Sequence, residues 1–171
     1  MATTAAGTPY VESSDLVANY PGVSLSLANH IDGLDGGKVL QVVAGVTTTS
    51  TATSSTSFVD TTLTATITPS DATSTIMVLV SQNGMQRRTG GGINVELYRD
   101  ATMVARLVGY GGNTNTNLVN NFGSVSGNYV DSPATTSAII YKTQFKSETG
   151  TAQTINAYGA YSSIVLMEVS A

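Results

Sequence analysis

The sequence predicts an all-β protein, an antiparallel β-sandwich of jelly-roll-like type preceded by a short N-terminal segment. Apolar residues alternate with Thr and Ser over much of the 171-residue chain, the period of strands with one buried face. Turn residues separate about eight to ten such runs at regular spacing, as in sandwiches and jelly rolls. Gly36 and Gly37 divide the chain into an N-terminal segment, residues 1–37, and a β-domain, residues 38–171.

The N-terminal segment has the pattern of a short helix. In residues 23–32, Val23, Leu27 and Ile31 recur every four residues and form a helical stripe. Val23, Leu25 and Leu27 also alternate, which fits a strand instead. An isolated helix of about ten residues is marginal in water, so the stripe needs a partner surface. That partner is either the protein's own β-domain or another protein, including further copies of the chain.

The first half of the β-domain is expected to contain three strands. Residues 39–46 are rich in Val and Leu and precede a Thr/Ser tract, residues 47–57, which fits either a polar strand or a long loop. Residues 58–68 alternate apolar side chains with Thr, which predicts one buried and one hydroxylated face. Residues 76–80 are apolar at every position, so we expect a central strand buried on both faces.

The second half of the β-domain combines strands with a long loop. Gly90, Gly91 and Gly92 break the chain before the next strand, and residues 98–103 read as a tight hairpin turn. Residues 109–127 are rich in Gly and Asn and are expected to form a long surface loop. Further strands are expected at residues 93–97, 104–108, 138–145, 152–158 and 163–169.

Charge and hydropathy exclude two classes of partner. The net charge is −4, and only Arg87 and Arg88 among the cations are adjacent, whereas nucleic-acid binding needs a basic stripe. No apolar run approaches the roughly 18 residues that span a bilayer, so no membrane insertion is expected. The first residues lack the basic and apolar regions of a secretory signal.

The chain offers little with which to build an active site. It has one His, His30, and no Cys, whereas nucleophilic catalysis and metal sites need several converging groups. Asp32 and Asp35 lie in a Gly-rich stretch that lacks the oxygen ladder of a Ca²⁺ loop and reads better as a linker. The other carboxylates show no spacing that pairs them for acid–base work. We therefore predict no catalytic residue, no metal site and no cofactor.

Two expected loops, residues 82–92 and 109–129, are candidates for recognition. Asn, Gln, Arg and Tyr side chains hydrogen-bond and stack on sugars or peptides, although ordinary solvated turns have the same composition. The candidate receptor-facing residues are Gln86, Arg87, Arg88, Tyr110, Asn113, Asn115 and Asn117.

Several stretches carry a resemblance to a known class of proteins: residues 8–21, 23–25, 28–32, 37–43, 63–70, 131–137 and 164–169. They are similar to segments of small tail-fibre or head-fibre proteins of tailed bacteriophages, notably of marine and cyanobacterial phages. The resemblance implies a virion protein made in the host cytoplasm, with an N-terminal segment that attaches to another virion protein. It also implies a trimer that points its β-domain outward and carries no catalytic residue.

On this resemblance, the apolar residues of the N-terminal segment become the expected anchor: Leu16, Val17, Tyr20, Val23, Leu27 and Ile31. The chain departs from long fibres because it has no shaft repeat, which leaves both tail and capsid as its place. Two other functions therefore stay open. One is a capsid decoration protein; the other is a carbohydrate-binding module or a glycan hydrolase with dispersed carboxylates.

Overall fold

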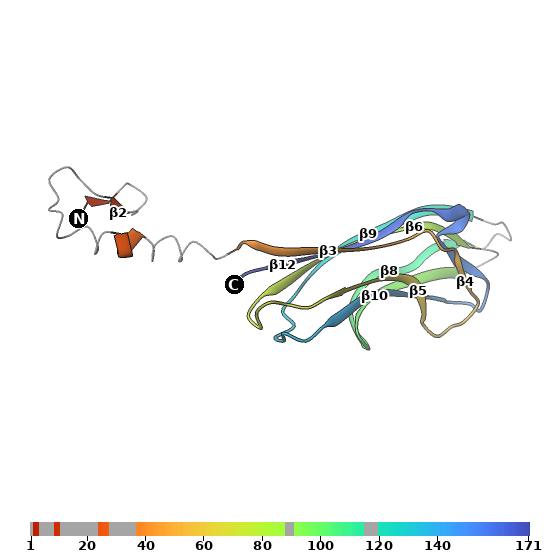
Figure 1. Ribbon diagram of the computed structural model, residues 1–171. Coiled ribbons are helices and arrows are strands. Elements are labelled where there is room, and N and C mark those ends of the chain that lie inside the picture. Colours follow the sequence, from red (N-terminus) through yellow and green to blue (C-terminus); the bar gives the residue numbers. More distant parts are fainter. Residues whose placement is uncertain (1, 4–8, 11–23, 28–36, 88–90, 115–119) are drawn as a thin grey trace. The chain divides into compact units, whose positions relative to one another are not determined.

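The computed structural model describes residues 2–3, 9–10, 24–27, 37–87, 91–114 and 120–171. The chain forms two compact units: Met1–Lys38 with Ser170–Ala171, and Val39–Val169. The division predicted after residue 37 lies next to the boundary between these units. The larger unit consists almost entirely of antiparallel strands (Figure 1), so the predicted all-β sandwich is confirmed.

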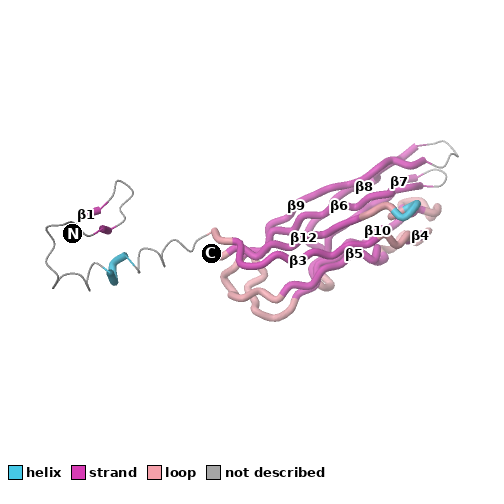
Figure 2. Tube along the Cα trace, turned by 45° about the horizontal axis from the view of Figure 1, so that its top comes forward, coloured by secondary structure: helices cyan, strands magenta, loops and turns pink. Residues whose placement is uncertain are grey.

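The smaller unit contains few described elements. Strands β1 (Ala2–Thr3) and β2 (Pro9–Tyr10) pair antiparallel, and residues 24–27 form a single helical turn (Figure 2). The helix expected over residues 23–32 is therefore described only in part. Leu27 lies in this turn and is exposed. The other expected anchor residues lie outside the described residues, as does His30: Leu16, Val17, Tyr20, Val23 and Ile31.

Two sheets face each other in the larger unit. The four-stranded sheet has the order β5 (Val59–Ile67), β10 (Ile139–Ser147), β7 (Gly91–Arg99), β8 (Thr102–Thr114). The six-stranded sheet has the four long strands β3 (Val39–Thr47), β12 (Ser162–Val169), β6 (Thr75–Arg87) and β9 (Asn120–Asp131) side by side. The short strands β11 (Gln153–Ile155) and β4 (Thr51–Thr53) complete it beyond the start of β12.

Most of the expected strands are present, and the expected loops are the main error. β6 continues to Arg87, β7 begins at Gly91, and β8 and β9 take up most of residues 109–127. Glycines did not end these strands because bulges absorb them. The β6–β9 ladder shifts register around Met85, beside Gly84 and Gly123, which both have positive φ. Of the polar strand expected over residues 152–158, only β11 forms, and a 3₁₀ turn (Ala157–Gly159) follows it.

The interior consists of two apolar clusters. The larger contains Leu63, Ala65, Ile67, Ile76, Val78, Val80, Leu97, Ile139, Tyr141, Ile164 and Leu166, and the smaller contains Met85, Ile93, Val95, Phe145 and Ile155. The alternation of residues 58–68 is confirmed from Leu63 onward, because Leu63, Ala65 and Ile67 are buried and the threonines at 62, 64 and 66 are exposed.

A layer of fully buried polar side chains lies between the clusters, and we call it the polar layer: Thr61, Gln82, Thr143, Asn156 and Ser162. Thr143 Oγ1 donates to Gln82 Oε1 at 2.8 Å, and Gln82 Nε2 donates to Asn156 Oδ1 at 2.6 Å. Since Thr143 and Gln82 belong to different sheets, this layer joins the two halves of the sandwich. Its hydrogen bonds replace those that water would make.

The strand predicted from residues 76–80 is central but not buried on both faces. It is part of β6, between β12 and β9. Ile76, Val78 and Val80 face the core, whereas Met77 and Leu79 are 37% and 38% exposed on the outer face of the sheet. The second half of that expectation was therefore wrong.

Candidate functional site

The structure does not support the receptor-facing assignment of Gln86 and Arg87. Gln86 is 7% exposed and Arg87 is fully buried. Both lie at the end of β6, where the backbone pairs with β9 on one side and β11 on the other. Gln86 Nε2 also donates to Asn121 Oδ1 at 2.9 Å. A strand paired on both sides holds these residues in the sheet, so they are not displayed on a loop.

Of the other candidates, Tyr110 is the one whose side chain can be placed. It is 47% exposed in β8, where its backbone has a positive φ of 60° and its N–H donates to Asn94 Oδ1. Asn113 also belongs to β8. Arg88, Asn115 and Asn117 lie outside the described residues. The structure therefore describes no binding site made of the predicted candidates.

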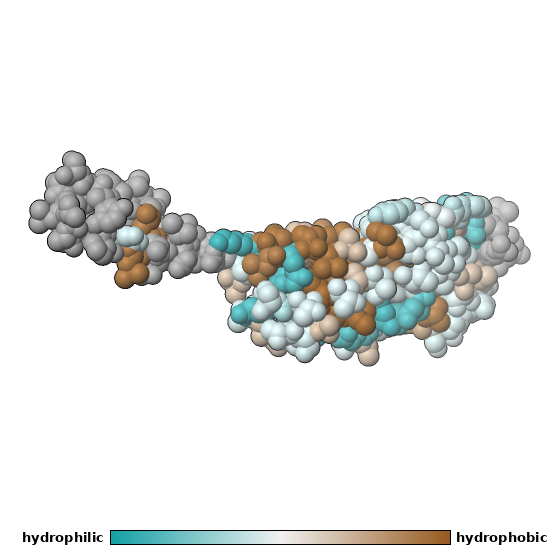
Figure 3. All heavy atoms as spheres, viewed as in Figure 1, coloured by the Kyte–Doolittle hydropathy of each residue, from teal (hydrophilic) through white to brown (hydrophobic). Residues whose placement is uncertain are grey.

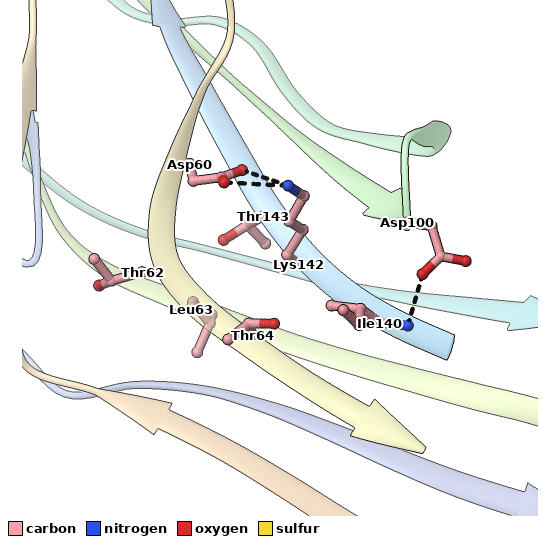
Figure 4. Close-up of a pocket in the computed structure, with 8 residues that line it drawn as sticks. All are labelled: Asp60, Thr62, Leu63, Thr64, Asp100, Ile140, Lys142 and Thr143. Carbon is pink, nitrogen blue, oxygen red and sulfur yellow. Dashed lines mark hydrogen bonds and ion pairs between the residues drawn. The ribbon is translucent and has the colours of Figure 1, made fainter. Parts of the chain in front are cut away.

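A pocket of about 450 Å³ opens on the outer face of the four-stranded sheet (Figure 4). Its walls come from β5, β10 and the β7–β8 turn, and the lining residues are Asp60, Thr62, Leu63, Thr64, Asp100, Ile140, Lys142 and Thr143. None of them was singled out in the sequence, because Asp60 and Lys142 lie 82 residues apart. Only the pairing of β5 with β10 brings them together.

A bulge in β5 shapes the pocket. Lys142 pairs with Thr64 and Gln144 pairs with Asp60, so three residues of β5 lie between these pairs where β10 has one. Within this bulge Thr62 has a φ of 74°, which is unfavourable for a β-branched residue. Its hydroxyl lies 3.0 Å from that of Thr47 in the other sheet.

Both signs of charge are held at the rim of the pocket. The Asp60 carboxylate pairs with Lys142 Nζ at 3.0 Å and accepts a hydrogen bond of 2.8 Å from Gln144 Nε2. Partial burial opposes its ionisation, but these contacts hold the pKa of Asp60 below its ordinary value. Asp100 Oδ1 accepts from the backbone N–H of Ile140 at 3.0 Å, which fixes the second carboxylate.

The second notable surface is the outer side of the six-stranded sheet, which we call the apolar face. A row of apolar side chains crosses four strands in register: Val42 of β3, Met167 of β12, Met77 of β6 and Val130 of β9. Val42 and Val130 are 59% and 61% exposed.

A second row runs beside the first and contains Ala44, Val165, Leu79 and Asn128. Leu40 and Val46 are exposed on the same side of β3. Figure 3 shows apolar side chains gathered over this part of the domain.

An ordinary solvated sheet exposes its charged side chains to water, whereas these four strands bury theirs. The strands contain three charged residues, Arg87, Asp131 and Glu168, and all three are buried. Every outward position whose side chain the structure describes is uncharged. The signal in the sequence was the continuous apolar run of residues 76–80, whose composition predicts a strand covered on both faces.

No protein-family model matches the sequence, and no curated protein matches it significantly. Within the described residues, no helix is long and apolar enough to cross a membrane. The same residues contain no cluster of three or more His, Asp or Glu side chains that could hold a metal ion. The assignment of a function therefore rests on the geometry of the pocket and of the apolar face.

Proposed function

We propose that this protein is a structural subunit of a phage virion, a short trimeric fibre held by residues 1–37 that presents its β-domain to the host surface. The observation that carries the proposal is the apolar face. Exposed apolar patches of several hundred square ångströms are uncommon on monomers and mark interaction sites. A sheet that buries its charges and exposes Val, Leu and Met is suited to being covered by another protein.

Further copies of the same chain are the partner that this face fits best. Because it carries no charge, identical faces can meet without like-charge repulsion. Both rows lie side by side on a broad, regular sheet, which suits three sheets packed around a common axis.

The strand order supports a jelly-roll assignment, which we include in the proposal. Apart from the β7–β8 hairpin, successive long strands alternate between the sheets, giving β3-β12-β6-β9 in one and β5-β10-β7-β8 in the other. Eight strands in two Greek keys make up a jelly roll, an architecture of viral capsid and lectin domains. Fold alone does not establish function, so the assembly surface carries more weight.

A capsid decoration protein is the second candidate. The sequence contains no shaft repeat, which suits a knob on a capsid as well as a stubby tail fibre. The two functions differ in location and copy number. Immuno-electron microscopy of intact particles separates them, because label at the tail indicates a fibre and label over the head indicates decoration.

Sedimentation of the full chain tests the assembly surface directly. We expect a trimer for the wild type and a folded monomer for Met77→Lys, which places a charge in the middle of the first apolar row. Thr66→Lys is the matched control, because Thr66 is exposed on the four-stranded sheet instead. A monomeric wild type, or a trimer that survives Met77→Lys, would contradict the proposal.

A further inference from the structure

We infer that the pocket between β5 and β10 is a binding site for one neutral sugar unit, a hexose or an N-acetylhexosamine of a surface glycan. The inference deepens the proposed attachment function and rests on it for its biological setting. Its evidence is separate, because it comes from the four-stranded sheet and not from the apolar face.

The size and lining of the pocket fit a small polyhydroxylated ligand. A volume of about 450 Å³ falls in the range of small-molecule sites, which combine apolar lining with a few placed polar groups. Ile140 is 43% exposed and offers an apolar surface to the C–H face of a sugar ring. Asp60, Lys142 and Thr64 supply acceptors and donors around it, all on the same two strands (Figure 4).

The polar groups are pre-positioned for this task. The contacts of Asp60 with Lys142 and Gln144 fix its carboxylate, yet the side chain remains 58% exposed. A fixed, ionised carboxylate accepts hydrogen bonds from hydroxyl groups about twice as strongly as a neutral acceptor. Binding therefore orders few protein groups, which reduces its entropic cost.

The charge balance selects against other ligand classes. The lining contains two carboxylates, Asp60 and Asp100, and one ammonium group, that of Lys142, which Asp60 already pairs. An anion such as a uronic acid or a phosphate would meet an excess of negative charge. A wholly apolar ligand would displace water from the Asp60 carboxylate without replacing its hydrogen bonds. A neutral sugar avoids both costs.

Backbone strain lies at the same place. A β-branched residue with positive φ is strained and persists only where the surrounding structure imposes it; such strain clusters at functional sites. In this protein the strained residue is Thr62, whose bulge displaces the strand beside the pocket. A regular β5 ladder would have had no such irregularity.

The site stays accessible in the proposed assembly. Thr64 and Ile140, which are paired across β5 and β10 to within two residues, are exposed on the four-stranded sheet. The apolar face belongs to the opposite outer side of the sandwich. A trimer packed through the apolar face would therefore direct three such pockets outward, which provides multivalent attachment from weak single sites.

A titration of the full chain monitored by NMR tests the inference. Glucose, galactose, mannose and N-acetylglucosamine are added separately to protein with labelled amides and isoleucine methyl groups. We expect at least one sugar to shift the Ile140 methyl signal and the amides of residues 60–64 and 140–144 saturably, with millimolar affinity. Glucuronic acid, the anionic probe, should bind more weakly than the best neutral sugar.

Variants decide whether the pocket is responsible. Asp60→Asn should weaken binding about tenfold, the loss expected when a charged hydrogen-bond acceptor becomes neutral. Lys142→Gln provides a second variant if the first does not fold. Asp71→Asn is the matched control, because Asp71 is an exposed carboxylate in the β5–β6 turn that bonds to Thr73. It should leave the affinity unchanged.

The outcomes separate this inference from the proposed function. No saturable shift with any of the four sugars, shifts that persist in both pocket variants, or tighter binding of glucuronic acid would each overturn the sugar site. Sedimentation of the same samples reports the assembly state. A trimer that binds no sugar overturns the site alone, whereas a monomer that binds sugar overturns the assembly and leaves the site.

Discussion

Gly45 of β3 and Thr64 of β5 bring the edges of the two sheets into direct backbone contact. A Cβ atom on Gly45 would lie 1.9 Å from the carbonyl oxygen of Thr64, a distance that no real contact shows. The absence of a side chain at residue 45 therefore allows the sandwich to close along this edge. The same stretch of β5 forms the pocket wall, so the closure also positions the candidate site.

Replacing Gly45 with Ala should destabilise the protein strongly. The new methyl group would push β5 away from β3, and overpacking of this kind costs about 1–3 kcal/mol or more. Urea unfolding measures the loss. Gly109→Ala is the control, because its Cβ would meet the flexible Arg106 side chain at 3.3 Å, and it should cost less than about 1 kcal/mol. Equal stabilities for the two variants would contradict the close contact.

The polar layer should be sensitive to the loss of one member. Gln82→Leu removes the amide that links Thr143 to Asn156 and leaves both without that partner in the interior. We expect a loss of about 1–3 kcal/mol in unfolding free energy, the cost of unpaired buried polar groups.

The triple variant Thr61→Val, Gln82→Leu and Thr143→Val provides the comparison. It should recover part of the loss, because the hydroxyls that would be stranded are removed as well. Additive losses across the three positions would argue against a coupled layer.

Glu168 should make the protein sensitive to acid. Burial opposes its ionisation, but hydrogen bonds from Gln41 Nε2 at 2.5 Å and from the N–H and hydroxyl of Ser70 at 2.7 Å outweigh it and lower its pKa to about 2. Because this pKa lies below the ordinary value of 4.5, the stabilisation is fully present above pH 4.5. It is lost progressively as the pH falls towards 2.

The variant Glu168→Gln checks this assignment. It should be less stable than the wild type by about 1–3 kcal/mol at neutral pH, where the wild type keeps its charged acceptor. Unfolding free energies measured across the acid range should differ less between the two proteins below pH 4.5, where Glu168 becomes protonated. A gap that stays constant down to pH 2 would show that Glu168 does not carry the effect.

Thr62 should tolerate glycine where an ordinary strand position does not. Its positive φ disfavours a β-branched side chain, so Thr62→Gly relieves strain and offsets the entropic cost of glycine. We expect stability equal to that of the wild type or up to about 1 kcal/mol higher. Thr66→Gly, at a regular exposed position of the same strand, should lose about 1 kcal/mol. Equal losses for both would remove the evidence for strain.

Local patterns in the sequence were sufficient for the sandwich class and for most strands. In residues 58–68 the alternation of Leu63, Ala65 and Ile67 with threonines predicted which side of β5 is buried, because the two-residue period of a strand is a local property. The lack of paired carboxylates or clustered His and Cys likewise directed the argument towards assembly and binding.

Properties that depend on pairing between distant strands came only from the tertiary structure. Gln86 and Arg87 have the composition of an exposed loop, yet pairing with β9 and β11 buries them. Asp60 meets Lys142 across β5 and β10, and no local pattern connects two residues 82 positions apart.

The apolar run at residues 76–80 shows what the sequence and the tertiary structure each determine. Its composition predicts a central strand but is the same whether a second layer of the chain or a second molecule covers Met77 and Leu79. Packing of one sheet against the other covers only one face of β6, and Met77 and Leu79 lie on the exposed face. The period of the apolar residues depends only on neighbouring positions in the sequence. Whether a face of the strand is covered depends on which distant strands pack against it.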